Sequence, residues 1–168
     1  MRHKRIEPLN DSIGAERLAR SMHVSQGGPN MPVTTELCIP MENRPGSLGK
    51  VCRALADRGV NIMALQSIPA KKTILVCIVA DNPIAARSIL DQEGISYTEA
   101  EVAQVKLLNR PGELARAAVR LGEANININY AYCGVEPGTN APLVIFGITE
   151  VGRAATILDE SAAAAAGA

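Results

Sequence analysis

ENRPGSL at residues 42–48 recurs as LNRPGEL at residues 108–114, which is 66 positions later in the chain. After each copy, apolar residues recur at positions i, i+3, i+4, i+7 and i+8, the spacing of one face of a helix. GVNI at 59–62 then recurs as NINI at 125–128, again 66 positions apart. A repeat that keeps one register over this length predicts two copies of the same structural unit.

Each unit has the pattern strand, helix, strand, strand, helix, and the first unit adds a fourth strand. In the first unit we expect strands at 33–39, 60–68, 73–80 and 95–102, a helix at 45–58, and a second helix that Pro83 opens and Gly94 ends. In the second we expect strands at 103–108, 126–133 and 142–149 and helices at 111–124 and 151–160. The second unit lacks a fourth strand, so its sheet has three strands or another segment or chain supplies the edge.

Strand–helix–strand units with short connections predict an α+β fold, with antiparallel sheets covered by helices on one face. We therefore expect two ferredoxin-like βαββαβ repeats without a linker between them. The predicted division of the chain is a flexible extension at 1–30, the first repeat at 31–102, the second at 103–160 and an alanine-rich tail at 161–168.

The composition excludes several classes of protein. Apolar residues make up 47% of the chain, and 17 basic residues balance 17 acidic ones. With no basic excess, no Trp and one Phe, neither a phosphate-binding surface nor a base-stacking surface is expected, so we predict no nucleic-acid partner. The longest apolar run, residues 74–80, is far shorter than the roughly 20 residues of a membrane helix, and no signal peptide is recognisable. We expect a cytoplasmic protein that does not bind membranes.

Catalytic and metal-binding patterns are also missing from the sequence. Four cysteines without a C-x-x-C pair (Cys38, Cys52, Cys77 and Cys133) are expected to be reduced core residues, and none has zinc-site spacing. Both histidines precede residue 31, and no phosphate-binding glycine loop is present. Acylphosphatases share this sandwich and use an Arg and an Asn, but their phosphate loop is absent here. We predict a non-enzymatic protein without cofactor or metal.

The repeated motifs resemble those of the ACT domain, a small βαββαβ ligand-binding module that regulates amino-acid metabolism. The first copy is similar to the regulatory domain of phosphoglycerate dehydrogenase, which senses serine, and the tandem copies are similar to stand-alone tandem ACT proteins. The resemblance covers residues 33–160. It implies an allosteric regulatory protein that binds a small amino acid and acts on a partner enzyme.

The turn before each first helix is a candidate carboxylate site, because N-terminal N–H groups of a helix have no intrahelical partner and glycine lets a ligand approach. In the serine-sensing relatives, asparagines matching Asn43 and Asn61 contact the amino acid, and Asn109 and Asn127 are their counterparts in the second repeat. The expected ligand-binding residues are Asn43, Pro45, Gly46, Ser47, Leu48, Asn61 and Ile62 in the first repeat, and Asn109, Gly112, Glu113, Leu114, Asn127 and Ile128 in the second.

Two observations bear on this site. The relatives carry a histidine two positions before the first asparagine, where this chain has Met41 and Leu107, so serine is not implied and a more apolar amino acid fits better. Each asparagine also has a structural explanation, since Asn favours turns and can bond loop backbone at a strand start.

We expect a homodimer, because the incomplete second sheet leaves an unpaired edge. The alternative function is a ligand-free interaction module that pairs with a partner enzyme through its sheet edges.

Overall fold

The computed structural model describes residues 33–70, 73–138 and 141–166 of the 168 residues, so the extension predicted at 1–30 lies outside them. The strands and helices follow one another in the predicted order. They are β1 (Val33–Glu42), α2 (Ser47–Ala56), β2 (Ile62–Ala70), β3 (Thr73–Ala80), α3 (Pro83–Gln92), β4 (Thr98–Lys106), α4 (Glu113–Glu123), β5 (Ile128–Val135), β6 (Pro142–Ile148) and α5 (Val151–Ala166).

The last helix is longer than the sequence pattern indicates. We expected it to end at residue 160 and the alanine-rich tail to follow, whereas α5 continues through the alanines to Ala166. Alanine has the highest helix propensity of all residues, so a run of alanines extends a helix that packing has already started. No helix in the described part of the chain combines the length and the apolar character needed to span a membrane.

The strands of the first repeat lie in the order β4-β1-β3-β2 and pair antiparallel, as in a ferredoxin-like sheet. The strands of the second repeat lie in the order β4-β6-β5. β4 belongs to both sheets, because it pairs with β1 over 98–103 and with β6 over 103–106. The two strands expected at 95–102 and 103–108 are therefore a single strand shared by the repeats.

The six strands close into one barrel in the order β1-β3-β2-β5-β6-β4, which corrects the expectation of two separate sheets. Among the described residues β1 pairs with β4 over 98–103, the first repeat's part of that strand, and this pairing does not extend to 104–106, beside which the missing fourth strand would lie. On the other side β2 meets β5 at the pair Ala64↔Gly134. A Cβ at Gly134 would lie 2.1 Å from the carbonyl oxygen of Met63, so only glycine permits this approach.

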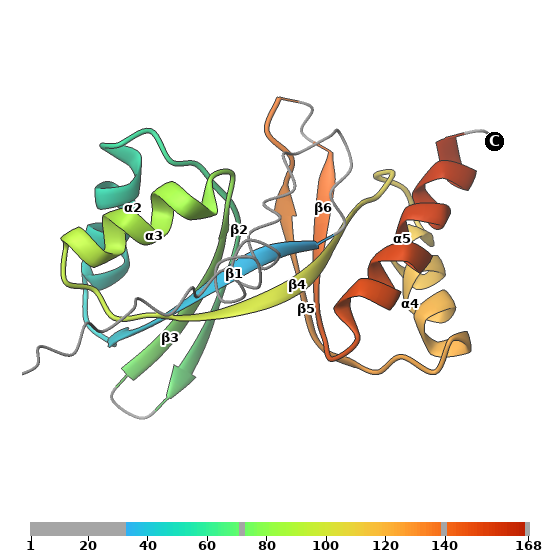
Figure 1. Ribbon diagram of the computed structural model, residues 1–168, viewed down its shortest axis with the longest axis horizontal. Helices are drawn as coiled ribbons and strands as arrows, with labels where there is room; N and C mark the ends of the chain where they lie inside the picture. The colour runs from blue at the N-terminus through green and yellow to red at the C-terminus, as the bar shows by residue number, and fades with distance from the viewer. Residues whose placement is uncertain (1–32, 71–72, 139–140, 167–168) are drawn as a thin grey trace, which may run out of the picture.

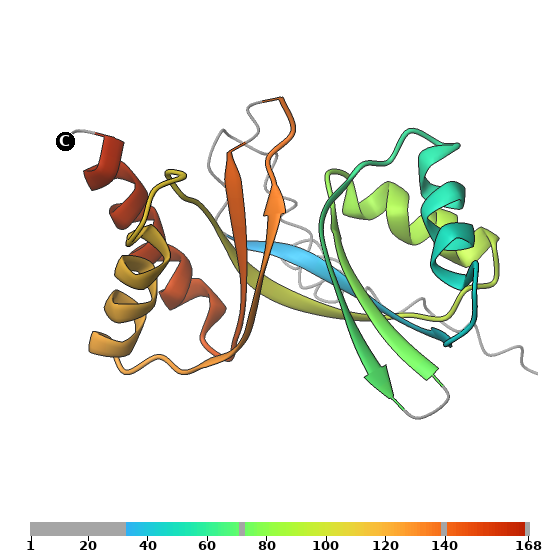
Figure 2. The ribbon, with the colours of Figure 1, turned by 180° about the vertical axis from the view of Figure 1, so that it is seen from behind.

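Helices cover the barrel at two opposite ends, with α2 and α3 at one end and α4 and α5 at the other (Figures 1 and 2). Each helix pair buries a core against the outer face of its own strands. A third, smaller core fills the interior of the barrel with buried Ala64, Val79, Val102, Leu143 and Ile145, against which Met63 and Tyr132 pack.

Two of the four cysteines do not have the predicted reduced form. Cys38 on β1 and Cys77 on β3 lie directly opposite each other and form a disulfide, whereas Cys52 and Cys133 are free. Facing residues of neighbouring antiparallel strands bring their Cβ atoms within the range that a disulfide requires. The 39 residues that separate the two cysteines hide this pairing in the sequence.

Candidate functional site

The turn of the first repeat, residues 43–48, connects the end of β1 to the start of α2. Gly46 precedes the helix with φ of 87°, a left-handed conformation that glycine adopts without strain. No side chain caps α2, and a Cβ at Gly46 would meet no atom within 4 Å. Ser47 is half-buried and the other residues of the turn are exposed. The start of α2 is therefore open, and its first N–H groups lack intrahelical acceptors.

The turn of the second repeat, residues 109–114, also has a left-handed glycine before its helix, but it carries a glutamate where the first repeat has Ser47. Gly112 has φ of 94° and precedes α4, whose first residue is Glu113. This carboxylate is buried, with 5% of the residue exposed, and it accepts hydrogen bonds from Arg110 Nε at 2.5 Å and from Arg116 Nη2 at 2.9 Å. The hydrogen bond from Arg110 lowers the pKa of Glu113, and the charge of Arg116 adds to this effect. The chain places its own carboxylate at this helix start.

The first repeat has basic residues at the positions of Arg110 and Arg116 but no acidic residue at the position of Glu113. At the offset of 66 residues, Arg110 corresponds to Arg44 and Arg116 to Lys50, whereas Glu113 corresponds to Ser47. Arg44 pairs with Glu42 at 2.8 Å, but both side chains are about two-thirds exposed, and such a surface pair contributes at most about 1 kcal/mol. The first repeat therefore has cationic residues at both matched positions and no acid at residue 47.

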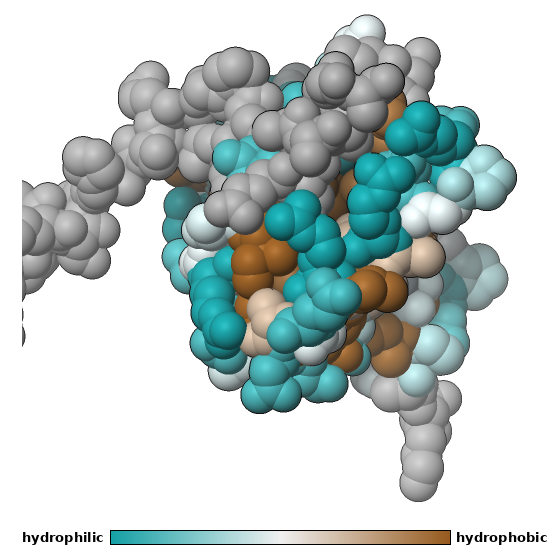
Figure 3. Space-filling model, turned by 90° about the vertical axis from the view of Figure 1, so that its right-hand side faces the viewer, coloured by the Kyte–Doolittle hydropathy of each residue, from teal (hydrophilic) through white to brown (hydrophobic). Residues whose placement is uncertain are grey.

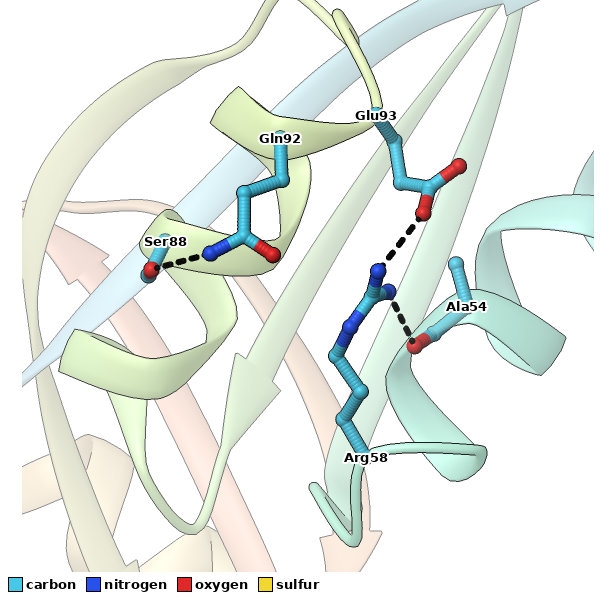
Figure 4. A network of polar contacts seen from close by, with 5 residues as sticks. All are labelled: Ala54, Arg58, Ser88, Gln92 and Glu93. Carbon is cyan, nitrogen blue, oxygen red and sulfur yellow. Dashed lines mark hydrogen bonds and ion pairs between the residues drawn. The ribbon is translucent and has the colours of Figure 1, made fainter.

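Lys50 also lines an open groove of about 580 Å³ on the α2–α3 side of the molecule. Arg58 ties the end of α2 to the end of α3, because it donates to Glu93 Oε1 at 2.9 Å and to the carbonyl oxygen of Ala54 at 3.4 Å (Figure 4). In the same view Gln92 donates to Ser88 Oγ within α3 at 3.2 Å. The sequence pattern does not predict these contacts, because charged positions on a helix indicate a solvated face and nothing more.

Asn61 and Asn127 lie just before β2 and β5. The N–H of Asn61 donates to Asp81 Oδ1 at 3.0 Å, and its carbonyl accepts from the N–H of Asp81, so this backbone joins β2 to the end of β3. The side chain of Asn127 donates to Asn129 Oδ1 at 3.0 Å. Ile62 and Ile128 are half-buried and pack against the two outer cores.

The two asparagines of one repeat do not lie together. β1 ends at the pair Glu42↔Thr73, whereas β2 begins at Ile62↔Ala80, at the other end of the same sheet. The second repeat has the same arrangement, with Lys106↔Leu143 near Asn109 and Ile128↔Ile148 near Asn127. A first helix that follows its strand carries the chain back along the sheet, so the end of one strand and the start of the next cannot share an edge.

The two turns are also remote from each other, because α2 and α4 lie at opposite ends of the molecule (Figures 1 and 2). Both turns carry an exposed leucine, with Leu48 38% and Leu114 48% exposed. Leu108 and Val119 are also exposed in the second repeat, and the view of the α4–α5 end shows apolar side chains among polar ones (Figure 3). Each turn thus ends in a leucine whose side chain is exposed.

Comparison with known proteins confirms the resemblance noted in the sequence. The family model described as the ACT domain pair matches residues 31–162. A protein from Bacteroides thetaiotaomicron has a similar structure over 77% of this chain and 88% of its own, with 23% identity and a TM-score of 0.68. The ligand-free regulatory subunit of aspartate kinase from Thermus thermophilus is similar over 79% of this chain and 93% of its own, with 16% identity and a TM-score of 0.54. No curated protein sequence matches the chain.

Proposed function

We propose a function for this chain, which belongs to the ACT domain pair family. The protein is a non-catalytic sensor that binds a small amino acid and regulates a partner enzyme of amino-acid metabolism. ACT domains are regulatory modules that bind amino acids. The observation that carries the proposal for this chain is the open start of α2, at the position where the second repeat holds a buried carboxylate of its own.

Glu113 serves as an internal model of a bound carboxylate. Its carboxylate accepts hydrogen bonds from Arg110 and Arg116, which supports the proposal that cationic side chains at these two positions favour a negative charge near the turn. The turn of the first repeat has Arg44 and Lys50 at those positions and the small Ser47 where the acid would be. An α-carboxylate at the start of α2 gains hydrogen bonds from backbone N–H groups and a favourable interaction with the helix dipole.

The remaining groups of an amino acid also find partners at this turn. Asn43 offers an amide oxygen to an ammonium group, and the exposed Glu42 carboxylate lies one residue before it. Leu48 presents apolar surface, which favours an apolar ligand side chain. Glu113 already occupies the equivalent turn, so we propose that the first repeat binds the ligand more tightly than the second.

Asn61 reaches such a ligand only from another molecule, because it lies at the opposite end of its own sheet. The proposal therefore includes a homodimer in which Asn61 of one chain approaches the turn of the other. Light scattering of the liganded protein is expected to give about twice the chain mass of 17.7 kDa. A monomer at saturating ligand would remove Asn61 from the site.

A thermal-shift panel with the twenty amino acids tests the proposal. A ligand at one hundred times its dissociation constant stabilises the folded state by about 2.7 kcal/mol, which raises the Tm by roughly 5–10 °C. We expect Ser47→Glu to abolish this shift, since it places a carboxylate where the ligand carboxylate binds. Ser47→Gln, which has the same size without the charge, is the matched control and is expected to lose less of the shift.

The sensor function would be contradicted if no amino acid raised the Tm of the wild type, and the proposed site would be contradicted if Ser47→Glu retained the full shift. The first would leave the ligand-free interaction module as the remaining function. The second would place the ligand elsewhere in the chain. Glu113→Ser completes the design, because removal of the internal carboxylate is expected to add a second binding event in the second repeat.

A further inference from the structure

Three potential metal ligands meet inside the barrel, remote from the helix starts. They are the carboxylate of Glu36 and the sulfurs of Cys38 and Cys77, and these atoms lie within 4.8 Å of one another. Alternation along β1 places Glu36 and Cys38 on the same face of the strand, and the strand register places Cys77 directly opposite Cys38. Glu36 is 1% and Cys77 2% exposed, whereas Cys38 is half-buried and gives access from solvent.

Side chains from two other strands hold the Glu36 carboxylate in place. Tyr130 donates to Oε2 at 2.5 Å and Tyr132 donates to Oε1 at 2.7 Å, both from β5 of the second repeat. Gln66 on β2 donates to Oε1 at 3.4 Å. Burial, together with the neighbouring Glu36, raises the pKa of both tyrosines, so their hydroxyls remain protonated donors. Hydrogen-bonded neighbours of this kind orient the ligands of metal sites.

The carboxylate has no cationic partner among the residues that the structure describes. Its polar neighbours are two hydroxyls, one amide and the sulfur of Cys38, which lies 3.5 Å from Oε2. A buried charge without an opposite charge is costly, and a bound cation would remove that cost. Two sulfur ligands beside one carboxylate favour a soft or borderline ion such as Zn²⁺ over Ca²⁺ or Mg²⁺.

We propose that Glu36, Cys38 and Cys77 bind a thiolate-preferring divalent metal ion of the zinc class when the disulfide is reduced. An external dithiol supplies the two electrons and two protons: the Sγ–Sγ bond breaks, two thiols form, and the dithiol becomes a disulfide. Metal binding then releases the two thiol protons to solvent, because the thiolate is the ligand. Two thiolates and the carboxylate coordinate the ion, and a solvent oxygen completes four ligands.

The disulfide and the metal exclude each other, since both use the same two sulfur atoms. Oxidation state therefore decides whether the barrel holds an ion. The site joins the repeats, because its ligands come from the first repeat and the tyrosines that orient Glu36 come from the second.

Titration of the full-length reduced protein with Co²⁺ under anaerobic conditions tests the proposal. We expect one Co²⁺ per chain, with thiolate-to-cobalt charge-transfer absorption and the d–d bands of a tetrahedral ion, both removed by Zn²⁺. The oxidised protein is expected to show neither band. Glu36→Gln keeps the size and the hydrogen-bonding capacity of the side chain but removes its charge, and it is expected to weaken Co²⁺ binding at least tenfold.

The other two cysteines supply the matched control. The Cys52→Ser/Cys133→Ser variant is expected to retain the cobalt spectrum, and the Cys38→Ser/Cys77→Ser variant to lose it. Alkylation of the reduced wild type is a second test, which does not depend on whether a variant folds. Zn²⁺ is expected to protect Cys38 and Cys77 from alkylation and to leave Cys52 and Cys133 reactive. Absence of the cobalt–thiolate band in the reduced wild type, or equal protection of all four cysteines, would overturn the proposal.

Discussion

The two repeats use the same turn in opposite ways. Both place a left-handed glycine before the first helix, yet the first repeat continues with Ser47 and leaves the turn open, whereas the second continues with Glu113 and fills it. The two turns thus differ at one matched position, which carries a half-buried serine in the first repeat and a buried, arginine-paired glutamate in the second. Both turns keep the left-handed glycine, with φ of 87° at Gly46 and 94° at Gly112, so the difference lies in the side chains.

The repeats also contribute unequally to the barrel. The first supplies four strands in ferredoxin-like order, and the second completes the barrel with β5 and β6 and shares β4. The polar contacts inside the barrel also join the two repeats, since Glu36 of the first repeat accepts hydrogen bonds from Tyr130 and Tyr132 of the second. Substitutions at the contacts between the repeats therefore test how far the stability of one repeat depends on the other.

The largest effect on this dependence is expected for Gly134→Ala, where the repeats meet. The new Cβ would lie 2.1 Å from the Met63 carbonyl oxygen and 2.5 Å from the Cβ of Ala64, so β5 has to move away from β2. We expect a loss of about 3 kcal/mol in the free energy of unfolding and a fall in Tm of roughly 6–12 °C. Calorimetry measures this change.

Gly122→Ala on α4 is the control for that substitution, because a Cβ there meets no atom within 4 Å. It is expected to stabilise the protein by about 0.5–1 kcal/mol, since alanine favours the helix more than glycine does. Equal Tm values for Gly134→Ala and the wild type would show that the approach of β2 to β5 does not hold the repeats together.

Tyr132→Phe is expected to have the next largest effect, because it removes a hydrogen bond to the buried Glu36 carboxylate. The expected loss is about 1.5–3 kcal/mol in the free energy of unfolding, measured by urea denaturation. The loss should shrink when Glu36→Gln is already present, because the charge that the hydroxyl stabilises is then gone. A loss of the same size in both backgrounds would assign the effect to ring packing instead.

The same hydroxyls predict a loss of stability at alkaline pH. Burial, then the hydrogen bond to Glu36, raises the pKa of Tyr130 and Tyr132 above the ordinary value of 10.0 in the folded protein. The folded state therefore binds these protons more tightly than the unfolded state, so the stabilisation is complete below pH 10 and decreases as pH rises above it. Urea midpoints of the wild type are expected to fall above pH 10, and those of Tyr130→Phe/Tyr132→Phe to fall less.

A smaller effect distinguishes the ends of the first helices. Gly59 and Asn125 occupy matched positions after α2 and α4, with φ of 74° and 58°. We expect Gly59→Ala to cost about 1 kcal/mol, because a Cβ disfavours the left-handed conformation. Asn125→Gly is expected to stabilise the second repeat by less than about 1 kcal/mol, since glycine adopts this conformation more easily. Chemical denaturation that gave both substitutions the same sign would contradict this explanation.

The smallest effect is expected at acidic pH from Glu113. The hydrogen bond from Arg110 lowers the pKa of this carboxyl below its ordinary value of 4.5, so its stabilisation is present above pH 4.5 and is lost as pH falls through the lowered value. Glu113→Gln should therefore reduce the dependence of Tm on pH below 4.5. Glu42→Gln, which removes an exposed ion pair of the first repeat, is the control for the loss of a surface carboxylate, since such a pair contributes at most about 1 kcal/mol.

Several features were accessible from the sequence because they depend on local patterns. The 66-residue repeat, the apolar spacing of the first helices and the glycines at 46 and 112 predicted the order of elements and the position of both turns. Membership in the ACT family also follows from the motifs themselves. The ligand-binding role of the asparagines stays a prediction, and the turn at 43–48 is the part of it that the geometry favours.

Other features depend on contacts between segments that are distant in the sequence. The sequence predicted Asn43 and Asn61 at one site. In the structure α2 carries the chain back along the sheet, so the two asparagines lie at opposite ends of it. The Cys38–Cys77 pairing depends on strand register, and the hydrogen bonds of Glu36 depend on residues 94 and 96 positions away. No pattern within a single segment contains this information.

By itself, the sequence determined two ACT-like units, their helices and strands, and the turn that carries Ser47 in one copy and Glu113 in the other, because propensity, periodicity and glycine placement act over a few residues. The tertiary structure decided that the units share β4, that β1 pairs with one half of β4 and β6 with the other, and that the six strands close at Ala64 and Gly134. The barrel closes because strand edges from distant parts of the chain pair, and because Gly134 has no side chain where β5 approaches β2. Both conditions depend on the arrangement of the whole chain.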